Sequence, residues 1–124
     1  MSHRTREQER ARLALNAVKA VPSDQRDDFK SQVRRLPSRI VTAGLLGSLA
    51  FLEAKASKSK GIERLIKALT EAVQTCDFDE GLGQNETLLR KLAEAKDDIY
   101  LRQVTDEVMA YTSWLKRMVE AHYA

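Results

Sequence analysis

The sequence predicts an all-α protein, and three of its features support that fold class. Alanine, leucine, lysine, arginine and glutamate dominate, only five glycines and two prolines occur among 124 residues, and apolar residues recur every three or four positions. The dominant residues lose little conformational freedom in a helix, and the apolar spacing gives each helix one face to bury. We therefore expect one helical domain over residues 1–124, a compact bundle of five to six helices, with disorder in residues 1–5.

The two prolines mark the expected boundaries of the first helices. A helix over residues 4–21 stops at the first proline. Ser23 is placed to cap a second helix, which should end near Leu36 because the residue before a proline is pushed out of the helical region. Pro37 then suits the first turn of a third helix, which continues to about Lys55.

The third helix contains an uncharged run from Ile40 to Leu52. This run is too short to cross a membrane, which needs about 20 apolar residues, so it predicts a central, nearly fully buried helix. Arginines precede the run and lysines follow it, and a straight helix of about 27 Å would hold the two basic groups apart. Small residues line one face of this helix and would let another backbone approach closely: Ala43, Gly47, Ala50 and Ala54.

The second half of the chain continues the helical pattern. A fourth helix runs to about Thr75, and residues 76–84 are expected to form a loop. Asn85 can cap a fifth helix, and a long last helix starts near Asp97 or Asp98. The apolar stripe of the last helix is the clearest periodic signal in the sequence: Leu101, Val104, Val108, Tyr111, Leu115, Met118 and His122.

Charge is distributed unevenly along the chain. Residues 1–60 hold thirteen Lys or Arg against six Asp or Glu, whereas residues 61–100 hold five against nine. A positive face attracts polyanions or an acidic neighbour, although bases at the ends of an apolar helix also simply keep a surface in solution. The pattern therefore leaves a polyanion-binding surface and a merely solubilising one as alternatives.

Residues that commonly carry out catalysis are sparse. Neither His3 nor His122 has a partner at metal-ligand or triad spacing, and Cys76 has no second cysteine nearby. Asp77 and Asp79 lie in a segment that lacks the glutamate closing a calcium loop, so a solvated turn is expected there. We expect no enzyme activity, no metal and no cofactor. The lone cysteine and the lack of a leader indicate a cytoplasmic protein with no membrane partner.

Two segments resemble a known family. LPSRIVTAGLLGSLAFLEAK (36–55) and RQVTDEVMAYTSWLKRMVEA (102–121) are similar to the small-subunit family of type III-B CRISPR effector complexes, the Cmr-type complexes. The shared elements are the Leu-Pro pair, the isoleucine three positions after the proline, the Gly-Leu pair, the Leu-Ala-Phe-Leu run and the Trp-Leu-Lys-Arg near the end. The family usually has asparagine before the Gly-Leu pair, where this chain has Ala43.

This resemblance implies a noncatalytic subunit that stacks with copies of itself into a short filament. The filament would lie along guide RNA and target RNA, beside other subunits that carry the ribonuclease chemistry, and would contact backbone phosphates without reading sequence. Alternatives are a small subunit of a type III-A or type I complex, or a helical adaptor that binds only protein. The candidate RNA-contacting residues are Arg34, Arg35, Arg39, Lys55, Lys58, Lys60, Lys116 and Arg117.

Overall fold

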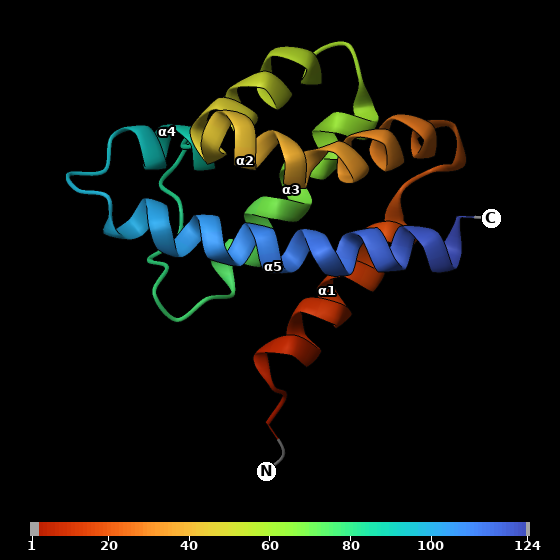
Figure 1. Ribbon diagram of the computed structural model, residues 1–124, viewed down its shortest axis with the longest axis horizontal. Coiled ribbons are helices and arrows are strands. Elements are labelled where there is room, and N and C mark those ends of the chain that lie inside the picture. Colours follow the sequence, from red (N-terminus) through yellow and green to blue (C-terminus); the bar gives the residue numbers. More distant parts are fainter. Residues whose placement is uncertain (1–2, 124) are drawn as a thin grey trace.

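The computed structural model describes residues 3–123, and the described chain is helical with no strand (Figure 1). This confirms the predicted all-α class. The predicted disorder of residues 1–5 falls partly on residues 1 and 2, which lie outside the described residues. The elements are α1 (Arg6–Ala20), a 3-10 turn η1 (Ser23–Gln25), α2 (Arg26–Ala56), α3 (Lys60–Gln74), α4 (Leu88–Ala93) and α5 (Ile99–His122).

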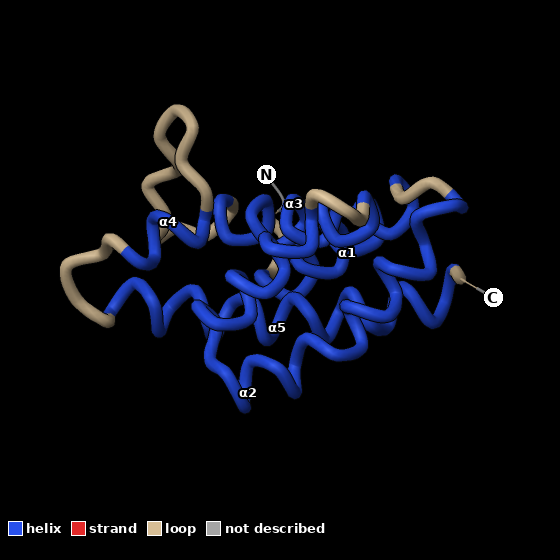
Figure 2. The backbone as a smooth tube through the Cα atoms, turned by 90° about the horizontal axis from the view of Figure 1, so that it is seen from above, coloured by secondary structure: helices blue, strands red, loops and turns tan. Residues whose placement is uncertain are grey.

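One apolar core joins the helices. The last helix, α5, spans the long axis of the molecule, and α1, α2 and α3 pack against it (Figures 1 and 2). The stripe predicted for this helix supplies the centre of the core, except that His122 lies exposed at its end. The largest fully buried side chains come from all four helices: Val18, Phe29, Val33, Leu36, Leu49, Leu52, Leu65, Leu69, Val73, Tyr111 and Leu115.

The expected helix boundary at Pro37 is wrong, because α2 continues through this residue. A proline inside a helix removes a backbone hydrogen bond and costs about 3 kcal/mol. Val33, Leu36 and Ile40 are all buried on the same face around it. Burying such side chains stabilises the fold by about 1.5–3 kcal/mol each, so packing outweighs the local cost of the proline.

The break in α2 occurs instead at Gly44, whose φ of 76° and ψ of 168° are not helical. Only glycine adopts this conformation without large strain. A Cβ built on Gly44 would meet no atom within 4 Å, so the backbone angles, rather than lack of space, require glycine. The hydroxyl of Ser48 donates to the Gly44 carbonyl at 2.8 Å and supports the bend. The bend divides α2 into a first arm, 26–43, and a second arm, 45–56.

The expectation that the segment after Pro37 is nearly fully buried is also wrong. Leu45, Leu49 and Leu52 are buried, but Val41 is 78% exposed. The four small residues of the predicted close-packing face lie exposed as well. The bend is the reason, because it buries one side of the second arm and leaves the small-residue side without a neighbouring helix.

Hydroxyl side chains begin three of the helices. Thr5 caps α1 in a reciprocal arrangement with Gln8, and Ser59 caps α3 by accepting from the Ile62 N–H at 3.3 Å. The cap of α4 is Thr87 rather than the expected Asn85, whose positive φ of 62° places it in the turn before. Ser23, expected to cap the second helix, begins η1 instead and makes no side-chain cap.

Gly61 permits close contact between the starts of α3 and α2. A Cβ on this residue would lie 2.6 Å from the carbonyl oxygen of Gln25 and 2.9 Å from the backbone nitrogen of Phe29. Ser59 adds a hydrogen bond to the Asp28 carboxylate at 2.8 Å across the same junction. These contacts fix the start of α3 against the start of α2.

Candidate nucleic-acid interface

The eight basic residues predicted to contact RNA are spread over the surface. Seven of them are exposed, and Arg39 is half-buried. None of the eight forms an ion pair with a carboxylate in the described part of the chain; the bases in ion pairs are Arg4, Arg6, Arg10, Arg12, Arg90, Lys91 and Arg102. The bases of this chain thus fall into two groups, one paired within the fold and one that includes all eight predicted residues.

The bend in α2 brings two of the predicted bases onto one aromatic ring. The guanidinium carbon of Arg39, on the first arm, lies 3.6 Å from the centroid of the Phe51 ring on the second arm. The Lys55 ammonium lies 5.4 Å from the same centroid. The expected separation of the two basic groups along a straight helix is therefore wrong for this pair. We call Arg39, Phe51 and Lys55 the bend face.

The other predicted bases lie elsewhere. Arg34 and Arg35 line a shallow hollow on the first arm of α2. Lys60 lines another hollow at the start of α3. Arg117 covers the half-buried Trp114 ring at 4.8 Å. The eight bases thus form several separate contact points rather than one pocket, an arrangement that suits an extended polyanion better than a small ligand.

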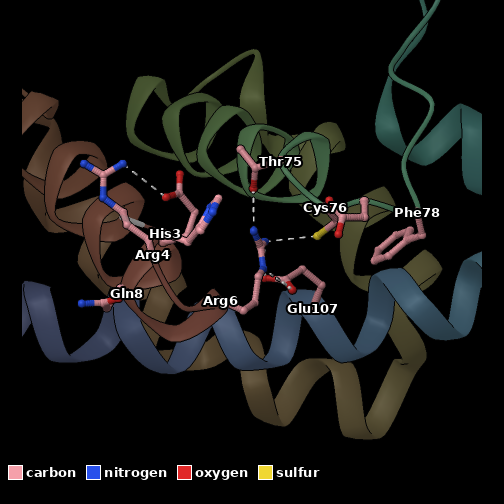
Figure 3. Close-up of a pocket in the computed structure, with 10 residues that line it drawn as sticks. His3, Arg4, Arg6, Gln8, Thr75, Cys76, Phe78 and Glu107 are labelled. Carbon is pink, nitrogen blue, oxygen red and sulfur yellow. Dashed lines mark hydrogen bonds and ion pairs between the residues drawn. The ribbon is translucent and has the colours of Figure 1, made fainter. Parts of the chain in front are cut away.

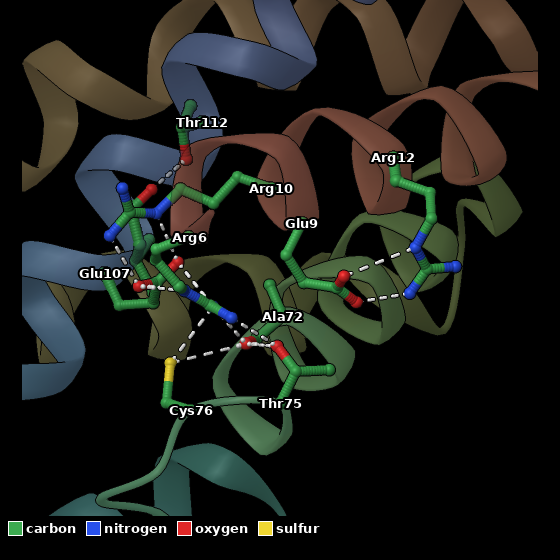
Figure 4. Close-up of polar contacts among 10 residues, drawn as sticks. Arg6, Glu9, Arg10, Arg12, Ala72, Thr75, Cys76, Glu107 and Thr112 are labelled. Carbon is green, nitrogen blue, oxygen red and sulfur yellow. Dashed lines mark hydrogen bonds and ion pairs between the residues drawn. The ribbon is translucent and has the colours of Figure 1, made fainter. Parts of the chain in front are cut away.

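A buried carboxylate binds two of the paired bases, Arg6 and Arg10, as Figure 4 shows. Glu107 on α5 is only 5% exposed, and Arg10 on α1 binds it through two hydrogen bonds of 2.9 Å. Arg6 adds a contact of 2.9 Å to the same carboxylate. Burial raises the pKa of Glu107, but the hydrogen bonds from Arg10 and Arg6 outweigh burial and hold this pKa below its ordinary value. We call Arg6, Arg10 and Glu107 the clamp.

The clamp also reaches the end of α3. Arg6 donates to the Thr75 hydroxyl at 2.9 Å and to the Cys76 sulfur at 3.1 Å (Figure 3). It also donates to the Ala72 carbonyl at 3.1 Å (Figure 4). One guanidinium thus satisfies acceptors from α3 and α5 while it belongs to α1. The sequence pattern did not predict this site, although an acid inside the apolar stripe of the last helix, between Val104 and Val108, indicates a buried carboxylate that needs a basic partner.

Cys76 belongs to the same neighbourhood and is a neutral thiol. It is 8% exposed. Burial and the nearby Glu107 charge raise the pKa of Cys76 to about 11, well above physiological pH. Only the thiolate form is a strong nucleophile or metal ligand. The described residues contain no group of three His, Cys, Asp or Glu side chains that could hold a metal ion.

The solvated turn that the sequence suggested after α3 is wrong for Asp79, whereas Asp77 is exposed as expected. The Asp79 side chain is 1% exposed and accepts hydrogen bonds from the Lys91 ammonium at 3.2 Å and from the Tyr100 hydroxyl. It also accepts from the Gly81 N–H at 2.9 Å. Burial and the Asp79 contact raise the pKa of Tyr100 above its ordinary value. This acid therefore ties the loop to α4 and α5.

Among residues 3–123, no helix has the length and apolar content needed to cross a membrane. The fold and the surface define a small all-α protein. The predicted bases, which form no ion pair in the described structure, lie at separate points around its helical body. The comparisons with known proteins then give the family.

A family model described as "CRISPR-associated protein (Cas_Cmr5)" matches residues 6–122. The chain therefore belongs to the Cmr5 family, and its resemblance to the small subunits of Cmr-type complexes is confirmed. The protein named CRISPR system Cmr subunit Cmr5 in Thermotoga maritima is 38% identical over 88 residues, which cover 71% of this chain and 67% of that relative. The protein of the same name in Thermus thermophilus is 32% identical over 122 residues, covering 95% and 96% of the two chains.

A solved structure has the same fold. The crystal structure of a CRISPR-associated Cmr5 family protein from Thermus thermophilus matches with a TM-score of 0.75 and 27% sequence identity. The match covers 95% of this chain and 97% of that one. The family match decides against the alternative of a type III-A or type I small subunit.

Proposed function

We propose that this chain acts as the noncatalytic small subunit of a type III-B effector complex, where it contacts the phosphate backbone of guide or target RNA and stacks with copies of itself. The observation that supports this role most is the division of its bases. None of the eight predicted residues makes a described ion pair, whereas the two half-buried arginines of the clamp are paired with Glu107. Exposed, uncompensated bases release counterions when phosphates bind, and this release supplies affinity without sequence preference.

The bend face favours contact with phosphates over stacking with bases. The Arg39 guanidinium already lies over the Phe51 ring, so that face of the ring is covered. A stacked guanidinium is held flat, and its planar fork of N–H groups suits the oxygens of a phosphate. The Arg39 Nε is buried without a hydrogen-bond partner, so the terminal nitrogens would make this contact. Arg34 and Arg35 on the same arm extend the contact along the strand.

Self-stacking is the second part of the proposal. Asp77, Glu80 and Asp97 are exposed in the segments before and after α4, and none of them forms an ion pair in the described structure. Such acids can meet bases of the next copy in a head-to-tail contact, the type of contact that an open filament needs. Sedimentation at low and high salt tests this part: we expect larger assemblies at low salt, and a monomer at every salt concentration would count against stacking.

RNA binding is tested by filter binding of a single-stranded RNA to the purified complex at several salt concentrations. The double variant Arg34→Glu/Arg35→Glu should weaken binding by about tenfold and reduce the slope of log affinity against log salt by about 1–2. Lys96→Glu, an exposed reversal outside the candidate surface, is the control and should change little. Equal loss in both variants would contradict the assignment, and salt-independent behaviour would favour the adaptor that binds only protein.

A further inference from the structure

A second surface follows α3. Two adjoining hollows of about 510 and 260 Å³ share Arg64 and Lys67 as a common wall. The smaller hollow lies between α1 and α3, and the larger one continues from it along α3 to Gln25 and to Lys60, one of the eight predicted bases. We call the two hollows together the α1–α3 groove. In Figure 2, α1 and α3 lie on the opposite side of the molecule from the middle of α2. This groove is therefore a separate surface from the bend face. Arg64 and Lys67 lie within residues 61–100, a stretch with more acids than bases, so the charge count along the sequence did not single them out.

The floor of the groove is apolar and made mostly of small side chains. Leu13, Ala17 and Ala20 on α1 face Ala68 on α3 across the smaller hollow. Ala20 is exposed, and Leu13 and Ala17 are half-buried. Alanines at these positions leave room for another helix or an extended segment to approach the two backbones closely.

The basic wall is pre-oriented. The Arg64 Nε donates to the side-chain oxygen of Gln25 at 3.0 Å, which fixes the guanidinium while its terminal nitrogens remain available. Neither Arg64 nor Lys67 forms an ion pair with a carboxylate among the described residues. A guanidinium presented in this way matches the two oxygens of a carboxylate.

The rim of the groove distinguishes between possible occupants. Glu63 lines the larger hollow beside Lys60, Arg64 and Lys67, and Glu71 lines the smaller one beside Arg64 and Lys67, so each hollow carries both signs of charge. A nucleic acid strand is negative along its whole length and would place phosphates beside the glutamates as well as beside the bases. A protein segment can instead place small apolar side chains on the alanine floor and a carboxylate beside Arg64 and Lys67.

We propose that the α1–α3 groove docks an acidic segment of another protein subunit of the effector complex, with small apolar side chains toward the floor and carboxylates toward Arg64 and Lys67. This proposal rests on the proposed function only in that the chain works inside a multisubunit complex. The groove engages protein on one side of the molecule, while the bend face engages RNA on the other.

The test uses the complex reconstituted with the remaining Cmr subunits, and native mass spectrometry measures how much of this chain is incorporated. Arg64→Glu/Lys67→Glu removes the basic wall, and Ala20→Trp fills the floor from an exposed position. Each change should weaken incorporation by about tenfold. Lys96→Glu is the matched control and should be incorporated like the unchanged protein. Circular dichroism checks that each variant remains helical.

Photocrosslinking from the same groove identifies the occupant. A photoreactive benzoylphenylalanine at position 20 should crosslink to a different polypeptide of the complex through an acidic segment. A crosslink to RNA or to a second copy of this chain would overturn the proposal, as would unchanged incorporation of both groove variants. Loss of RNA binding in Arg34→Glu/Arg35→Glu is measured separately, so failure of the groove and failure of the RNA surface are distinguishable.

Discussion

The clamp and the bend face use the same kind of side chain for opposite purposes. In the clamp, Arg6 and Arg10 surround a carboxylate that is 5% exposed. At the bend face, Arg39 and Lys55 lie over the Phe51 ring and form no ion pair with a described carboxylate. An arginine that is paired with a buried carboxylate has a structural role, whereas an arginine without a carboxylate partner is available to a polyanion. Its position in a basic stretch of the sequence does not distinguish the two cases.

The largest effect should follow from breaking the clamp. Glu107→Ala leaves two partly buried arginines without their carboxylate, and breaking such a buried pair costs about 3–5 kcal/mol. Urea unfolding at neutral pH measures the loss. Asp106→Ala, an exposed neighbour with no described ion pair, should change stability by less than about 0.5 kcal/mol. If the two variants lose the same stability, the clamp is not a structural site.

The bend can be broken directly at its glycine. Gly44→Ala places a side chain in a conformation that only glycine adopts freely, so we expect a loss of about 1–3 kcal/mol in unfolding free energy. Gly47→Ala, three residues further along in the helical second arm, is the control. Its Cβ would lie 3.3 Å from the Ala43 Cβ, so a small shift is needed, but alanine favours a helix and the net loss should be smaller. A Gly44 variant as stable as the Gly47 variant would show that α2 does not need this bend.

Acid should weaken the clamp in a defined direction. The pKa of Glu107 in the folded protein lies below the ordinary value of 4.5. Ionised Glu107 therefore stabilises the fold fully at a pH above its pKa in the unfolded chain. The stabilisation is lost as pH falls through the folded pKa. Urea midpoints measured from pH 7 to pH 3 should therefore fall more steeply for the unchanged protein than for Glu107→Gln. Parallel curves would contradict a depressed pKa at this residue.

The smallest effect is expected at the bend face, where the shape of one base can be changed without changing its charge. Arg39→Lys keeps the charge at the bend face but loses the planar group that lies on Phe51. We expect RNA affinity to fall by about twofold, with stability almost unchanged. Lys116→Arg, which conserves charge at an exposed position, should leave the affinity as it is. A loss as large as that of Arg34→Glu/Arg35→Glu would show that Arg39 reads the RNA directly through its planar group.

The sequence predicted the helical class and most helix positions because apolar periodicity and capping residues act locally. It misplaced the break in α2 because Pro37 is a strong local signal, whereas the burial of Leu36 and Ile40 that overrides it is a tertiary effect. The role of Gly44 was hidden for the same reason. The residues within each arm of α2 do not indicate that the two arms fold toward each other.

The candidate surface was predictable in part. The charge count along the sequence identified the basic first half of the chain. The resemblance to the Cmr-type small subunits suggested that this half contacts RNA. Counting alone does not separate Arg6 and Arg10 from Arg34 and Arg35, because the separation depends on Glu107, about a hundred positions away in sequence. The groove bases Arg64 and Lys67 were missed because they lie within an acidic stretch and become neighbours of α1 only in the folded chain.

The most direct measurement compares two variants in two assays. Arg34→Glu/Arg35→Glu and Glu107→Gln are each assayed for urea stability and for RNA affinity at a temperature where both are folded. We expect the first to lose about tenfold in RNA affinity with stability almost unchanged, and the second to lose stability with RNA affinity unchanged. RNA affinity that falls equally in both variants would contradict the division of the bases into structural and RNA-contacting groups.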